Sequence, residues 1–172
     1  MRRHNILRSY VAQYEMVSGN DNCLDAVPVH AVAALNTHDM HPFAAFWQGI
    51  DIEEREVCGV LSRDQAAREA DRRVSGREAL LRCLYRRKLI VGPAPAPAEI
   101  YRAVCRVLAL SDAEVLLLNI DDLAGSTKAH NIPGTCYEHP NRRRRTDQPL
   151  EQLENNPDIA SFLQEIDTKR KQ

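Results

Sequence analysis

A short apolar run is followed directly by polar residues in the stretch Ala31-Val32-Ala33-Ala34-Leu35-Asn36-Thr37-His38-Asp39-Met40. The continuous apolar run predicts a strand of a parallel sheet that is covered on both faces. The imidazole of His38 and the carboxylate of Asp39 then lie at the carboxyl end of the strand, where parallel α/β barrels build their catalytic sites. Adjacent residues of a regular strand point to opposite faces, so the pair can serve one pocket only where the strand breaks into its loop.

Two other segments are predicted to be strands. Ser9-Tyr10-Val11-Ala12-Gln13-Tyr14 is rich in aromatic and β-branched residues, and Glu114 to Ile120 is a second continuous apolar run. Helical patterns lie between and after these strands, so the order predicts an α/β fold. Three parallel strands alone leave two open edges with unpaired backbone groups, which indicates a piece of a larger sheet.

The helix signals are mainly caps and breakers. Pro42 and Gly49 bound a short helix, and a second runs from about Asp51 to Gly59. Ser62 with Gln65, and Ser75 with Glu78, have the form of capping boxes that open two further helices. The remaining segments are a stiff connector at 92–97, an amphipathic helix at 98–110, and a helical pair from Leu150 to about Lys169 interrupted at Asn156-Pro157.

Composition excludes several classes of protein. The 172 residues fit one ordinary domain, and 23 basic against 24 acidic residues argue against nucleic acid or an anionic membrane as partner. No apolar stretch approaches the ~20 residues that span a bilayer, and no apolar segment follows the basic N-terminus as in a secretory signal. The five cysteines lack C-x-x-C spacing, so we expect free thiols and a cytoplasmic protein; they are Cys23, Cys58, Cys83, Cys105 and Cys136.

Four stretches carry a family resemblance when taken together. They are Met1-Arg2-Arg3-His4 leading to Tyr10-Val11, Leu35 to Met40, Phe43 to Glu53, and Asn131-Ile132-Pro133-Gly134-Thr135 through Arg144. They resemble the amylomaltases, or disproportionating enzymes, which are 4-alpha-glucanotransferases of the α-amylase superfamily. The stretches follow the family's order over nearly the whole chain, and the combination is far more specific than the His-Asp step alone.

The resemblance implies the C-terminal part of a (β/α)8 (TIM) barrel with helical insertions. Residues 1–172 then form a single partial domain, with a helical insertion at about 50–92, a Pro-rich connector at 92–97 and C-terminal helices at about 150–170. The strands at Tyr10, Val32 and Leu116 correspond to the last three of the eight. This correspondence agrees with the two open edges.

The resemblance also implies a reaction, the retaining transfer of α-1,4-glucan segments between maltooligosaccharides, which requires no cofactor and no metal. Asp39 matches the family's carboxylate that stabilises the oxocarbenium-like transition state, and His38 beside it is expected to bind substrate. Asn131 either contacts sugar hydroxyls or holds its own loop together. The family's nucleophile Asp and acid/base Glu precede this region, so we expect the chain alone to be inactive, with the missing N-terminal part of the barrel as a candidate partner.

Two departures from the family pattern and two alternatives stay open. Arg142 stands where the family usually has Trp, and His130 stands where Gln or a similar polar residue is expected. One alternative is a truncated, non-functional remnant of such an enzyme. The other is a non-catalytic module that binds an anionic partner through Arg142–Arg145.

Other residues are assigned structural roles. Phe46 and Trp47 are expected to pack in the core rather than stack on sugar rings. Asp121-Asp122 is expected to support or cap the segment after the third strand. A metal cluster of His30, His38, Asp39 and His41 is disfavoured because its spacing matches no standard zinc pattern.

Overall fold

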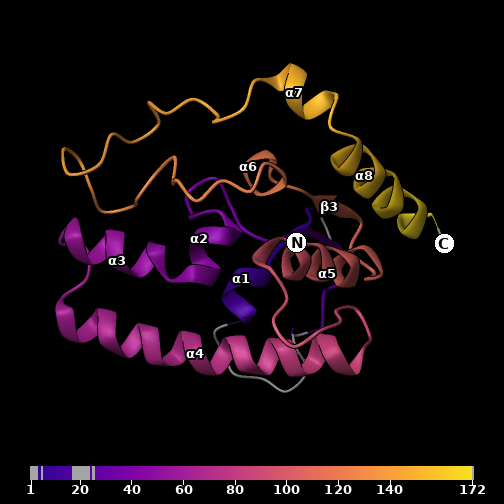
Figure 1. Ribbon diagram of the computed structural model, residues 1–172, viewed down its shortest axis with the longest axis horizontal. Helices are drawn as coiled ribbons and strands as arrows, with labels where there is room; N and C mark the ends of the chain where they lie inside the picture. Colours follow the sequence, from indigo (N-terminus) through magenta and orange to yellow (C-terminus); the bar gives the residue numbers. More distant parts are fainter. Residues whose placement is uncertain (1–3, 5, 17–23, 25, 172) are drawn as a thin grey trace.

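A computed structural model of the chain describes residues 4, 6–16, 24 and 26–171 (Figure 1). The predictions for Met1–Arg3 and Cys23 lie outside these residues. The elements, in chain order, are β1 (Arg8–Val11), α1 (Ala12–Glu15), β2 (Ala31–Ala34), α2 (Phe43–Gln48), α3 (Ile50–Val57), α4 (Arg63–Arg86), α5 (Pro97–Ala109), β3 (Val115–Leu117), α6 (Ile120–Leu123), α7 (Leu150–Glu154) and α8 (Pro157–Arg170).

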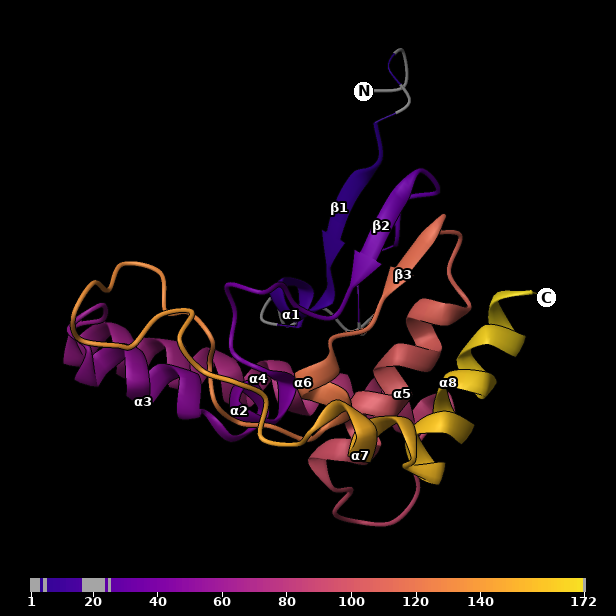
Figure 2. The same ribbon diagram turned by 90° about the horizontal axis from the view of Figure 1, so that it is seen from above.

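The described strands form a parallel sheet in the order β1-β2-β3, as Figure 2 shows. Tyr10 pairs with Ala33, which pairs in turn with Leu116. The prediction of three parallel strands is therefore confirmed. The prediction that the first strand extends to Tyr14 is wrong, because β1 ends at Val11 and the chain turns at once into the single turn of α1.

The two faces of the sheet have different surroundings. One face carries Tyr10, Ala31 and Ala33, which are buried in a core shared with α5, and Leu116, which packs against that core. The opposite face is open and forms part of the lining of a cavity of about 430 Å³, through Ser9, Val11, Val32, Ala34 and Leu117. The expectation that both faces are covered is wrong within the described residues, because their helices supply apolar side chains to one face only.

The helical insertion contains fewer breaks than the sequence suggests. Ser62 opens α4 with the predicted capping box, in which Gln65 N donates to Ser62 Oγ and Gln65 Oε1 accepts from Ser62 N. The second predicted start at Ser75 is wrong, because α4 continues unbroken to Arg86. The Ser75 hydroxyl instead donates to the Asp71 carbonyl one turn earlier, the back-bonding that mid-helix serines use.

The last helix, α8, packs against α5. As predicted, the tail breaks into α7 and α8, with Asn156 capping α8 and Pro157 in its first turn. Arg106 of α5 makes a fork with Glu165 of α8, with nitrogen–oxygen distances of 2.7 and 2.8 Å. The rings of Tyr101 and Phe162 pack beside this pair at a centroid separation of 6.1 Å.

The cysteines only partly follow expectation. Cys58, Cys105 and Cys136 are free thiols. Cys83 is disulfide-bonded, so the expectation of a free thiol is wrong at that position. None of the described helices is long and apolar enough to cross a membrane.

Candidate functional site

Asp39 lies in the turn that follows β2, at the carboxyl edge of the sheet. Its carboxylate has three described neighbours from two parts of the chain. His38 Nε2 lies 3.1 Å from Oδ2, whereas Asn131 Nδ2 and Arg142 Nη2 donate to Oδ1 at 3.0 and 3.1 Å. The candidate residues His38, Asp39 and Asn131 are therefore together, with the Asp39 side chain about two-fifths exposed.

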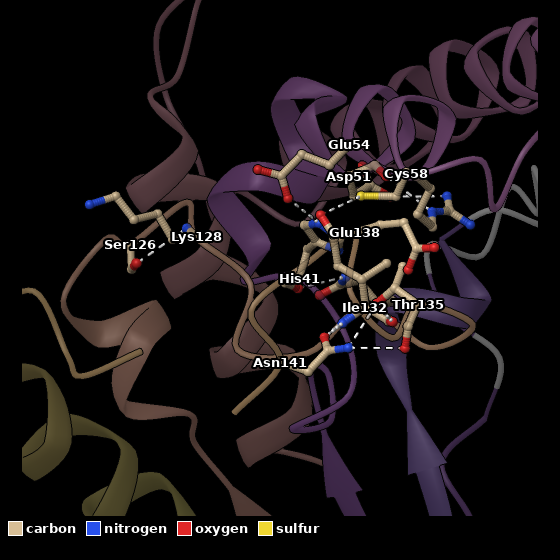
Figure 3. Close-up of polar contacts among 12 residues, drawn as sticks. His41, Asp51, Glu54, Cys58, Ser126, Lys128, Ile132, Thr135, Glu138 and Asn141 are labelled. Carbon is tan, nitrogen blue, oxygen red and sulfur yellow. Dashed lines mark hydrogen bonds and ion pairs between the residues drawn. The ribbon is translucent and has the colours of Figure 1, made fainter. Parts of the chain in front are cut away.

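The loop that carries Asn131 is held by Asn141 rather than by Asn131 itself. Asn141 Oδ1 accepts from Ile132 N at 2.9 Å, and its amide nitrogen donates to Thr135 Oγ1 at 2.8 Å and to the Thr135 carbonyl (Figure 3). Gly134 takes a φ of 91°, which favours glycine at this turn. The Asn131 side chain itself donates to Asp39, which links this loop to the turn after β2.

The same loop is also tied to the helical insertion. The thiol of Cys58, which follows α3, donates to the carbonyl of Glu138 at 3.9 Å (Figure 3). The Glu138 carboxylate accepts from the backbone N–H groups of Cys136 and Tyr137, and these bonds lower its pKa. The loop facing Asp39 is thus fixed at both its tip and its base.

A buried polar network joins the ends of β2 and β3 beneath the site. Asn36 Nδ2 donates to Asp122 Oδ2 at 2.7 Å, and Asn36 Oδ1 accepts from Asn119 at 3.2 Å. Asp122 Oδ1 accepts a hydrogen bond at 2.5 Å from the N–H of Phe43, which is the first residue of α2. The supporting role expected of Asp122 is confirmed, because it bonds an otherwise unpaired helix N–H and fixes the start of the His38-Asp39 turn.

Burial raises the pKa of Asp122 from 3.8 to about 6, although its bonds with Phe43 and Asn36 favour the charged form. A carboxyl group whose pKa is raised on folding stabilises the protein most below about pH 4. That contribution, on the order of 3 kcal/mol, is lost as pH rises to about 6.

We therefore expect Asp122→Asn to change how stability depends on pH. The free energy of unfolding of the unmodified chain, minus that of Asp122→Asn, should fall as pH rises from 4.5 to 7, as measured by urea unfolding. Lost hydrogen bonds shift this difference equally at each pH, so they cannot produce the trend. Parallel stability profiles for the two chains would contradict the expectation.

The arginine run is engaged in ion pairs at two of its four positions. Arg142 is exposed and reaches Asp39, and its N–H donates to the His130 carbonyl at 2.7 Å. Arg144 is mostly buried, and its Nη2 donates to Asp121 Oδ1 at 2.8 Å. His130 Nε2 lies 2.8 Å from the other oxygen of Asp121, so Asp121 anchors the loop after β3 from both sides.

No group of three or more His, Cys, Asp or Glu side chains among the described residues is arranged to hold a metal ion. Phe46 and Trp47 are both buried, which confirms the core role expected of them. The groups around Asp39 offer hydrogen bonds and charge. A carboxylate, an imidazole and a carboxamide meet at a partly exposed turn beside two cavities, one lined by His38 and the other by Asp39.

Comparison with known proteins identifies the family. A family model described as 4-alpha-glucanotransferase matches residues 1–150. The chain belongs to the 4-alpha-glucanotransferase family. It is 25% identical to a 4-alpha-glucanotransferase of Haemophilus influenzae over 177 aligned residues, which cover 99% of this chain and 25% of that enzyme. It is 30% identical to the Mycobacterium tuberculosis 4-alpha-glucanotransferase over 115 residues, or 66% of this chain and 16% of that enzyme.

The fold agrees with this membership. The crystal structure of amylomaltase from Corynebacterium glutamicum matches with a TM-score of 0.77 at 20% identity, over 96% of this chain and 25% of that one. The chain thus spans a quarter or less of the length of the 4-alpha-glucanotransferases it matches. The resemblance read from His38-Asp39 and the Asn131 loop is confirmed at the level of the family.

Several residues of the site escaped the sequence reasoning. Asn36 and Asn119 each lie two residues after the last residue of a strand, and this shared position is a signal that could have predicted their contact. Asn141 belongs to a stretch that carries the family resemblance, but no pattern in the sequence assigned its side chain the role of holding the loop. The pairing of Arg142 with Asp39 joins residues 103 positions apart and has no local signature.

Proposed function

We propose that this chain supplies one section of the active site of a retaining 4-alpha-glucanotransferase that acts on α-1,4-glucans and maltooligosaccharides. In this proposal the three strands are part of a (β/α)8 barrel. Asp39 is the carboxylate that stabilises the transition state, and His38 and Asn131 bind substrate. The convergence of these three residues at the carboxyl edge of a parallel sheet, in a member of this family, supports the proposal.

The proposed chemistry assigns Asp39 an electrostatic role. In retaining transfer a carboxylate attacks the anomeric carbon while a carboxylic acid protonates the leaving oxygen. The 4-hydroxyl of a second glucan then gives its proton back to that acid/base group and displaces the enzyme carboxylate from the anomeric carbon. The sugar ring gains positive charge at each step. A fixed carboxylate that accepts hydrogen bonds from ring hydroxyls holds the distorted ring and stabilises that charge. The imidazole of His38 supplies a further hydrogen-bonding group to the substrate.

The proposal includes inactivity of the chain by itself. Retaining transfer needs a nucleophile and an acid/base, and the family resemblance assigns both to a section preceding this one. The open face and edges of the sheet give that section a surface on which to pack.

The test is glucose release from maltotriose by this chain alone, by the N-terminal section of a related 4-alpha-glucanotransferase alone, and by the two mixed. We expect activity only in the mixture. The N-terminal section must also be shown to be folded and bound to this chain. If the mixture then releases no glucose, the alternative of a non-functional remnant is favoured.

The ion pairing of the arginines disfavours the alternative of a module that binds an anionic partner. Arg142 forms an ion pair with Asp39, and Arg144 forms one with Asp121. The other two arginines of the run, Arg143 and Arg145, are exposed. Two isolated positive charges on a chain of net charge −1 provide little attraction for a polyanion.

The Arg142–Asp39 pair itself is expected to compete only weakly with a sugar. Exposed ion pairs contribute about 0.2–1 kcal/mol, so Arg142→Ala should raise the rate of glucose release in the mixture by no more than about fivefold. Arg143→Ala, an exposed neighbour, is the matched control and should leave the rate unchanged. A large loss of activity in Arg142→Ala would instead mean that Arg142 takes part in catalysis.

A further inference from the structure

The turn that carries Asp39 is short and partly exposed. Met40 N donates to the Thr37 carbonyl at 3.0 Å, which closes a turn with Asp39 at its third position. His38 and Arg142, two of the side chains beside the Asp39 carboxylate, are 80% and 67% exposed. Exposed ion pairs restrain their partners only weakly, so the direction of the Asp39 carboxylate depends mainly on how the two ends of the turn are held.

Buried side chains hold both ends of this turn. On the entry side, Asn36 is buried and donates to Asp122. On the exit side, His41 is 6% exposed, and its Nε2 lies 2.8 Å from Oε2 of Glu54 in α3 (Figure 3). The His41 carbonyl also accepts from Nε2 of Gln13 in α1, at 3.4 Å. His41 therefore joins the exit of the turn to two helices.

Glu54 is itself attached to the helical insertion. Its helix, α3, packs against α4, and Asp51 of α3 forms a fork of two 2.9 Å hydrogen bonds with Arg73 of α4. Residues three positions apart lie on the same side of a helix, so Asp51 and Glu54 project together. One of them fixes α3 to α4, and the other reaches His41. A continuous set of contacts thus runs from α4 to the residue two positions after Asp39.

Accurate placement matters for a carboxylate that stabilises a transition state. Its effect depends on being held in position before the charge on the sugar ring develops, and a misplacement of about 1 Å can cost on the order of 10²-fold in rate. A buried contact that fixes the backbone beside such a group can therefore influence the reaction without touching the substrate.

We propose that His41 and Glu54 are positioning residues for Asp39. Their contact holds the exit of the turn against α3 and so fixes the direction in which the Asp39 carboxylate points. The inference rests on the proposed function, because it takes Asp39 as the group that stabilises the transition state. It gives the helical insertion a part in the reaction, through α3.

The first test compares kcat and KM of the mixture for maltotriose among variants of α3. Methionine has the length of glutamate but no acceptor, so Glu54→Met should lower kcat about tenfold and leave KM within about twofold. Glutamine keeps an oxygen that accepts from the imidazole, so Glu54→Gln should retain most of kcat. Glu56 is an exposed carboxylate of the same helix, and Glu56→Met, the matched control, should leave kcat unchanged.

A double variant asks whether Glu54 acts through Asp39. In the Asp39→Asn chain, Glu54→Met should lower kcat by less than about twofold, because the charge to be positioned is gone. A tenfold fall in both backgrounds would mean that Glu54→Met disturbs the enzyme as a whole, and this overturns the positioning role. The Glu54 side chain is 38% exposed, so we expect Glu54→Met to remain folded, as urea unfolding checks.

Amide chemical shifts of the chain alone test the structural part of the inference. The shifts of residues 37–41 should move in Glu54→Met and stay in place in Glu56→Met, and unmoved shifts in both overturn the positioning role. Equal kcat for Glu54→Met and the unmodified chain, in a mixture that releases glucose, overturns it and leaves the proposed function intact. If the unmodified mixture releases no glucose, the proposed function fails and the positioning role fails with it.

Discussion

Asp39→Asn is expected to lower the kcat of the mixed enzyme for maltotriose by about 10²- to 10³-fold, the usual effect of removing one preorganised electrostatic group. Asparagine keeps the size of the side chain but has no charge to oppose the positive charge on the sugar ring. One of its two terminal atoms is also a donor, and in the position of Oδ1 it would face the donors Asn131 and Arg142.

The loss should appear in kcat more than in KM, because the missing charge matters most in the transition state. Asp167→Asn is a suitable control, since Asp167 is an exposed carboxylate of α8 paired with Lys171. Urea unfolding of Asp39→Asn tests whether the chain remains folded. Activity within about fivefold of the unmodified mixture, in a folded variant, would remove Asp39 from the catalytic role.

The sequence was sufficient where the determining signal is local. Gly49 ends α2 in the left-handed conformation with a φ of 87°, and the Ser62 capping box opens α4, both as predicted. The apolar runs located the strands to within a few residues, and the order of elements implied a parallel sheet. The nearness of Asn131 to His38-Asp39 was implied only by the family resemblance, because Asn131 lies beyond α6 and not at the end of β3.

The sequence was insufficient where local signals compete or where the partner is remote. Ser75 with Glu78 has the form of a cap, but α4 continues through it. The helix buries Ala66 before this point and Ala79 and Leu80 after it, so packing on both sides favours an unbroken helix. The open face of the sheet was also not predictable. An apolar strand indicates that both faces are covered, but it does not show whether the covering elements belong to the same stretch of chain. The paired hydrogen bonds between Asp51 and Arg73 depend on how α3 packs against α4. Neither a helix-capping residue nor the spacing of apolar residues predicts that packing.

That fork provides the largest expected change in stability. Arg73 is buried, bonds both oxygens of Asp51 at 2.9 Å, and lies over the ring of Phe46 with its guanidinium carbon 3.5 Å from the ring centroid. Among the described residues, Arg73→Met leaves the buried Asp51 carboxylate with only the longer contact to Arg55, at 3.4 Å. The expected loss in the free energy of unfolding is about 3–5 kcal/mol, measured by urea unfolding at pH 7.

A double variant separates the cost of an unpaired charge from the value of the pair. Asp51→Leu combined with Arg73→Met should recover most of the stability, because burying two apolar side chains avoids the desolvation of two charges. Lys171→Met is the surface control, and loss of its exposed pair with Asp167 should change stability by about 0.5 kcal/mol or less. If Arg73→Met is no more destabilised than Lys171→Met, the fork does not hold α4 against α3. The cavity beside Asp39 would then lack a fixed wall, because Asp51 and Arg73 are part of that wall.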